Sequence, residues 1–154
     1  METIVAGRID RLRRKLSKQK IDTFLVLIQE NRRYLSGYTG EDTQFDESAG
    51  ALILSQKAQI LATDSRFELQ ANAEAPLYDL IIYQKGLVRE LPVVLSRLKT
   101  RRLGIEGLRM SYNFYVKLCE ELKAQNLDIE IVDTSHLVEE LRMVKDNAEI
   151  DAIK

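Results

Sequence analysis

The feature that most constrains the fold is an uninterrupted run of apolar, strand-forming residues at positions 24–28. A strand that is apolar on both faces suits the centre of a sheet covered by helices on both sides. Before it, Val5, Ile9, Leu12 and Leu16 recur at steps of four, three and four, which is one stripe of a 3.6-residue period. A helix followed by a doubly covered strand predicts an α/β protein.

The rest of the chain continues this alternation of helices and strands. Further strands are expected at 51–54, 58–62, 78–83, 102–106 and 129–132. Helices are expected from an Asn31 cap to Gly37, over 66–74, from near 89 with Pro92 in the first turn, after a Ser111 cap, and over 137–144. We therefore predict a three-layer α-β-α sandwich with a mixed sheet of about six strands.

Composition and charge indicate an ordinary soluble domain of 154 residues with a net charge of −1. No apolar run approaches the roughly 20 residues that span a bilayer, no secretory signal is visible, and one cysteine excludes an internal disulfide. We expect a cytoplasmic protein. The first 20 residues hold seven cations, which we interpret as a solvated helix face and not as a nucleic-acid or anionic-surface site: Arg8, Arg11, Arg13, Arg14, Lys15, Lys18 and Lys20.

The sequence lacks the common motifs that indicate a particular catalytic reaction. It has no phosphate-binding glycine loop, H-E-x-x-H, C-x-x-C or G-x-S-x-G. The single histidine, His136, has no cysteine or carboxylate at ligand-like spacing on a regular element, so we interpret it as a surface or structural residue. Cys119, next to Leu118 on a predicted helix, is interpreted as a partly buried packing residue.

Two groups of charged residues remain as candidate sites. The acids of the polar loop do not follow the order of a calcium-binding loop, which favours a solvated loop; they are Glu41, Asp42, Asp46 and Glu47. Asp64 and Arg66 directly follow an apolar strand, and ligands of open α/β sheets gather at strand ends. The simpler alternative is that Asp64 caps the next helix and Arg66 neutralises it.

Five short motifs occur in order along the chain. They are R-x-x-x-L at 8–12 with the strand that follows, N-R-R-Y-L-S-G-Y-T-G at 31–40, T-D-S-R-F with Q-A at 63–71, L-G-I-E at 103–106, and L-R-M-V-K-D-N-A-E-I at 141–150. Together they resemble the N-terminal domain shared by creatinase, prolidase and aminopeptidase P. The resemblance covers about residues 4–154, and the acidic loop after Gly40 departs from the short Ser- and Gly-containing turn of many relatives.

The resemblance implies a non-catalytic N-terminal domain over residues 1–144. Residues 145–154 would begin the linker helix into a C-terminal metallopeptidase domain that this sequence does not contain. In that family, proline-specific peptidases use two divalent ions (Mn, Co or Zn), held by Asp, His and Glu residues of the C-terminal domain. The resemblance thus implies no catalytic residue, metal ligand or cofactor in this chain, which alone should be inactive.

The family's N-terminal domain typically serves dimerisation and substrate access. By that resemblance Tyr38, Asp64, Arg66 and Phe67 are candidates for access or dimer contacts, with Arg66 as the cation for a substrate carboxylate. The implied partners are the chain's own catalytic domain, a second copy and a proline-containing peptide, with no nucleic acid and no membrane. Two alternatives stay open: the same domain on a creatinase-like amidinohydrolase, and a stand-alone α/β module that binds nucleotides or nucleic acid.

Overall fold

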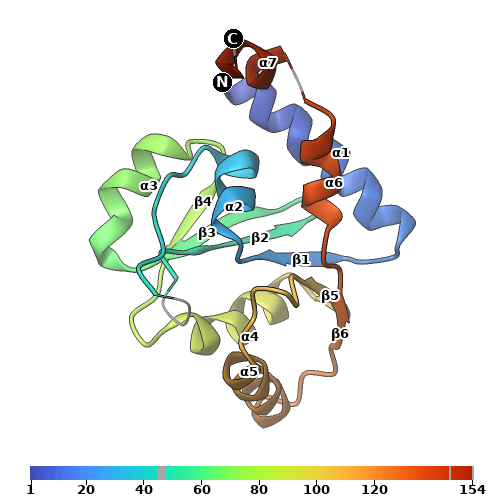
Figure 1. Ribbon diagram of the computed structural model, residues 1–154. Helices are drawn as coiled ribbons and strands as arrows, with labels where there is room; N and C mark the ends of the chain where they lie inside the picture. The colour runs from blue at the N-terminus through green and yellow to red at the C-terminus, as the bar shows by residue number, and fades with distance from the viewer. Residues whose placement is uncertain (45–47, 146, 154) are drawn as a thin grey trace.

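The computed structural model describes residues 1–44, 48–145 and 147–153, and it confirms the three-layer α-β-α sandwich (Figure 1). The mixed sheet has six strands in the order β4-β3-β2-β1-β5-β6. The strands are β1 (Thr23–Val26), β2 (Ala51–Ser55), β3 (Gln59–Thr63), β4 (Asp79–Ile82), β5 (Arg102–Ile105) and β6 (Glu130–Asp133).

The helices divide between the two faces of the sheet, with α4 and α5 on the face opposite α1, α2 and α6 (Figure 1). The helices are α1 (Glu2–Lys18), α2 (Gln29–Ser36), a 3₁₀ turn η1 (Ser65–Phe67), α3 (Glu68–Glu74), α4 (Leu87–Arg97), α5 (Tyr112–Ala124), α6 (Leu137–Met143) and α7 (Asn147–Ile153). No helix in the described part of the chain combines the length and apolarity needed to cross a bilayer.

The central strand β1 separates two hydrophobic cores. Phe24 and Val26 pack into the core under α1, α2 and α6, whereas Leu25 and Leu27 pack into the core under α4 and α5. All four side chains are buried, as the apolar run predicts. Because successive side chains of a strand point to opposite faces, this one segment holds the three layers together.

Strand direction brings several loop starts to one edge of the sheet. β1 runs parallel to β5, β5 to β6 and β3 to β4, while β2 is antiparallel to both of its neighbours. The residues that follow β1, β3, β4 and β5, at 27–28, 64, 83 and 106, therefore lie at a common edge, which we call the carboxyl edge. The chain leaves β1 for α2 on one face and β5 for α5 on the other, and such a switch point is where open α/β sheets form a crevice.

Two predictions of helix starts are wrong. Helix α2 begins at Gln29, and Asn31 is buried in its first turn instead of capping it. The Glu106 carboxylate accepts the backbone N–H groups of Leu27 and Ile28, so a distant acid fixes this helix start. Helix α4 begins at Leu87, after Gly86 with φ of 92°, which places Pro92 beyond the first turn with its ring buried.

The interpretation of the basic N-terminal helix as a wholly solvated face is also wrong. Arg8 is buried, donates to the Tyr34 carbonyl at 2.9 Å, and its guanidinium lies 4.2 Å from the centre of the Tyr34 ring. Arg13 donates to the carbonyls of Ser55 and Ala58 in the β2–β3 turn. These two cations fasten α1 to α2 and to the sheet.

Candidate functional site

At the end of β3, Asp64 and Arg66 form one interlocked pair. The Asp64 carboxylate accepts the backbone N–H of Arg66 at 2.9 Å and two guanidinium N–H groups at 3.0 and 2.8 Å. These hydrogen bonds hold the pKa of Asp64 below its usual value. Asp64 thus caps η1, as the simpler alternative predicted, and the Arg66 side chain, 72% exposed, is held in one orientation at the surface.

The other two predicted residues lie beside this pair. The Phe67 ring meets the Tyr38 ring edge-on, with 6.5 Å between centroids, and the Arg66 guanidinium lies 5.4 Å from the centre of the Phe67 ring. Tyr38 is 1% exposed and donates its hydroxyl to the Ala49 carbonyl at 2.8 Å. The structure therefore brings all four residues together, with Tyr38 as a buried support behind Phe67.

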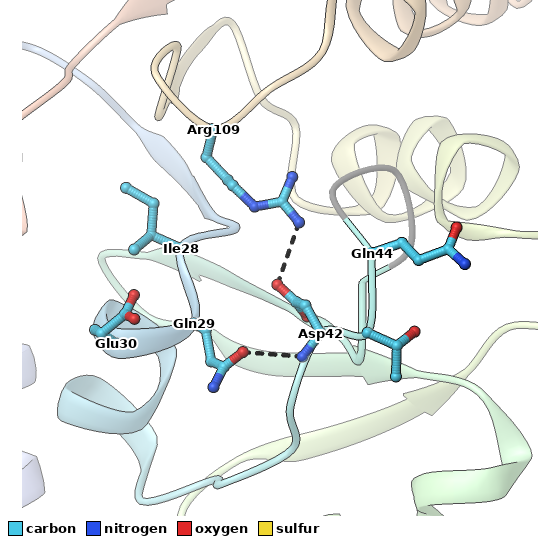
Figure 2. A pocket seen from close by; sticks show the side chains of 7 residues that line it. Ile28, Gln29, Glu30, Asp42, Gln44 and Arg109 are labelled. Atoms are coloured by element: carbon cyan, nitrogen blue, oxygen red, sulfur yellow. Dashed lines mark hydrogen bonds and ion pairs between the residues drawn. The ribbon is translucent and has the colours of Figure 1, made fainter.

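A second group at the same edge was missed by sequence reasoning. The Arg32 side chain is fully buried and forms an ion pair with Asp42 at 2.9 Å, and Arg109 reaches the other oxygen of Asp42 at 3.2 Å. Arg109 and Asp42 both line a cavity of about 340 Å³. Figure 2 shows the Arg109–Asp42 contact, with Gln29 accepting the backbone N–H of Asp42. The prediction of a solvated acidic loop is wrong for Asp42; Asp46 and Glu47 lie outside the described residues.

The pKa of Asp42 follows from its two cations. Burial alone would raise it, but the hydrogen bonds and charge of Arg32, with help from Arg109, hold the pKa of Asp42 below its usual value. No local sequence pattern marks the Asp42–Arg109 ion pair, because the two residues are 67 positions apart in the chain. The Arg109 guanidinium links the acidic loop to the segment after β5.

The third group surrounds Glu106, directly after β5. Glu106 is 2% exposed, and its carboxylate accepts the N–H groups of Leu27 and Ile28 and the Asn31 side-chain amide at 2.6, 2.9 and 2.6 Å. Arg142 of α6 donates to the Asn31 oxygen at 3.0 Å. Burial raises the pKa of Glu106 to about 7, against the lowering effect of its hydrogen bonds.

Metal ligation is not supported by these groups. Within residues 1–44, 48–145 and 147–153, no three His, Cys, Asp or Glu side chains converge on a common point. His136 is exposed at the start of α6, and Cys119 is half-buried on α5. The two-metal ligand set of the family therefore does not fit onto the described part of this chain.

Comparison with known proteins gives consistent matches. The model of the Creatinase/Prolidase N-terminal domain matches residues 8–144. The structure of an Xaa-Pro dipeptidase from Bacillus anthracis is similar at 30% identity and a TM-score of 0.82, over 96% of this chain and 38% of that chain. The N-terminal domain of cytoplasmic peptidase PepQ from Mycobacterium tuberculosis is similar at 28% identity and a TM-score of 0.76, over 88% of this chain and 98% of that chain.

Among curated relatives, the uncharacterized peptidase YqhT of Bacillus subtilis is 26% identical over 147 residues, which are 96% of this chain. The chain spans 38% of the length of that relative. The family match covers far more than half of the sequence, and the fold is similar to that of the Bacillus anthracis dipeptidase over 96% of this chain. The chain belongs to the creatinase/prolidase N-terminal domain family.

Proposed function

We propose that this chain is the non-catalytic N-terminal domain of a proline-specific peptidase, an Xaa-Pro dipeptidase or aminopeptidase, and that it serves dimerisation and substrate access. The supporting observation is its extent: it covers 38% of an Xaa-Pro dipeptidase but 98% of a separate N-terminal domain. Residues 1–144 are the domain, and 145–154 begin the linker helix to the catalytic domain. Two divalent ions (Mn, Co or Zn) act in that domain, and the location is cytoplasmic.

The access role is assigned to the surface made by Asp64, Arg66 and Phe67. Arg66 supplies a cation at a fixed place, because the Asp64 carboxylate accepts two hydrogen bonds from its guanidinium and fixes its orientation. Phe67 supplies an apolar wall, and Tyr38 supports it from inside the core. A site that selects short peptides needs both features. The cation binds the free carboxylate and orients the peptide, and the apolar wall limits its length.

The test is Arg66→Ala in the full-length protein. The expected result is a rise of about tenfold in KM for an Xaa-Pro dipeptide with a smaller change in kcat, because one charged hydrogen bond to bound substrate is lost. Arg97→Ala, an exposed arginine in the last turn of α4, is the matched control and should leave KM unchanged. Equal KM values for Arg66→Ala and the parent protein would exclude this access role.

The dimerisation role has its own test. The full-length protein should sediment at the mass of two chains. A monomer at micromolar concentration would contradict this part of the proposal.

A further inference from the structure

A second cavity of about 410 Å³ opens at the carboxyl edge, on the α4/α5 face of the sheet. Its walls combine apolar side chains with polar groups from the ends of β3 and β4; the apolar ones are Leu27, Leu87, Val88, Met110 and Phe114. The volume is in the range of small-molecule sites, which are also mainly apolar with a few placed polar groups. Its position at the switch point of the sheet is where α/β folds bind ligands.

The Tyr83 side chain reaches this cavity, and its hydroxyl has no hydrogen-bond partner in the described part of the chain. The residue is 9% exposed. Burial, followed by the nearby Asp64 carboxylate, raises the pKa of Tyr83 to about 12, so the phenol keeps its proton at neutral pH. The protonated hydroxyl is therefore available to donate a hydrogen bond to an acceptor bound in the cavity.

The first residues of two helices line the same cavity. Gly86, Leu87 and Val88 line it at the start of α4, where no side chain caps the helix. Ser111 and Asn113 line it at the start of α5, where the Ser111 side chain satisfies only the N–H of Phe114. The first N–H groups of a helix have no partner inside the helix and favour anions.

The charged side chains of the lining are predominantly positive. Arg66, Arg109 and Lys117 line the cavity with the single carboxylate of Asp64; Arg66 is paired with Asp64 and Arg109 with Asp42 outside the lining. No ion pair or hydrogen bond joins Lys117 to another residue in the described part of the chain. The cavity therefore offers donors and positive charge at its rim and apolar surface within.

We propose that this cavity is a binding site for a small organic anion, an apolar body carrying one carboxylate or phosphate, with Tyr83, Lys117 and the starts of α4 and α5 as its donors. The apolar body lies among Leu87, Val88, Met110 and Phe114, and the oxyanion accepts hydrogen bonds from these donors. The site shares Asp64 and Arg66 with the access surface, but its proposed donors are other residues, and Arg66 is left unchanged in its test. A failure here would leave the access role intact, and the reverse also holds.

The test titrates the 154-residue chain with three probes and follows amide chemical shifts. The probes are 3-phenylpropionate, phenyl phosphate and the neutral 3-phenylpropanamide. One of the two anions, or both, should shift the amides of Leu87, Val88 and Asn113 with a Kd of about 1 mM or tighter. The neutral amide should bind at least about tenfold more weakly, and comparison of the two anions shows which oxyanion the site prefers.

Two variants locate the binding. Tyr83→Phe and Lys117→Ala should each weaken anion binding by about five- to tenfold, and neither side chain holds the fold through a hydrogen bond to a described residue. Lys57→Ala, in the β2–β3 turn at the opposite edge of the sheet, is the control and should bind like the parent chain. Unshifted amides at about 10 mM of either anion, equal binding of the neutral probe, or unchanged Kd in both variants would overturn the proposal.

Discussion

At the residue scale, the fully buried Arg32 guanidinium depends on one carboxylate. Asp42 is its ion-pair partner, and Leu27, Gly40 and Ser48 supply further acceptors around it. Asp42→Asn keeps the shape but removes the negative charge, which leaves a buried cation without its counter-ion. We expect the free energy of unfolding in urea to fall by about 3 kcal/mol.

Glu41→Gln is the matched control for this change, because it removes an exposed acid next to Asp42 in the chain. We expect its free energy of unfolding to stay within about 0.5 kcal/mol of the parent value. The pKa of Asp42 is lowered in the folded state, so its contribution is present above the unfolded pKa and is lost as the pH falls through the folded pKa. If both variants unfold at the same urea concentration, Arg32 does not depend on Asp42.

Glu106 gives the opposite pH dependence. Burial raises its pKa from 4.5 to about 7, so the folded state binds a proton that the unfolded state releases within this window. Stability from this group is present below pH 4.5 and is lost as the pH rises to about 7, a decrease of up to about 3 kcal/mol. Glu106→Gln, which is neutral at every pH, should remove this part of the slope.

The measurement is urea unfolding of both proteins between pH 4.5 and 8. Glu120→Gln, which changes an exposed acid on α5, is the control and should show the same dependence of the free energy of unfolding on pH as the parent. If the free energies of unfolding of the parent and Glu106→Gln change equally with pH, Glu106 does not bind a proton on folding in this range.

At the scale of elements, the end of α2 requires a glycine and the middle of α1 does not. Gly37 has φ of 84°, and a Cβ there would lie 3.0 Å from the Glu74 carbonyl oxygen. Gly7 is exposed within α1, with no atom within 4 Å of a Cβ. We expect Gly37→Ala to lower the melting temperature through a loss of about 1–2 kcal/mol, and Gly7→Ala to raise it through a gain of about 0.5–1 kcal/mol.

Gly37→Ala and Gly7→Ala are controls for each other, because both changes add the same methyl group. An increase in melting temperature for Gly37→Ala would mean that α2 does not end in the left-handed conformation.

Elements with local signals were predictable from the sequence. The apolar run of β1, the Ser111 cap of α5 and Gly37 after α2 all depend on residues close together in the chain. The start of α2 was not predictable, because Glu106, 78 residues from Ile28, sets it. Asp42 was assigned to solvent because no periodicity marks a buried ion pair and its partner Arg32 belongs to another element.

The candidate site was predictable in part. The motif at 63–67 pointed to Asp64, Arg66 and Phe67, and the structure joins them with Tyr38. No sequence pattern predicted the cavity around Tyr83, because its walls come from the ends of several strands and the starts of two helices. Only the order of strands in the sheet brings them together.

At the scale of the whole molecule, two cores on either side of one sheet form a scaffold that orders its carboxyl edge. The Asp42 and Glu106 groups at that edge are held by contacts between segments far apart in the chain. Such a scaffold presents fixed side chains to a neighbour. In our account that neighbour is a catalytic domain, which performs the reaction.

The most direct test of this account is the activity of the purified 154-residue chain, measured with Mn²⁺ and an Xaa-Pro dipeptide, with the full-length protein as the positive control. We predict no hydrolysis above the buffer rate and less than one tightly bound metal ion per chain, while the full-length protein cleaves the dipeptide. Stoichiometric metal together with turnover of the dipeptide by the 154-residue chain alone would contradict the account.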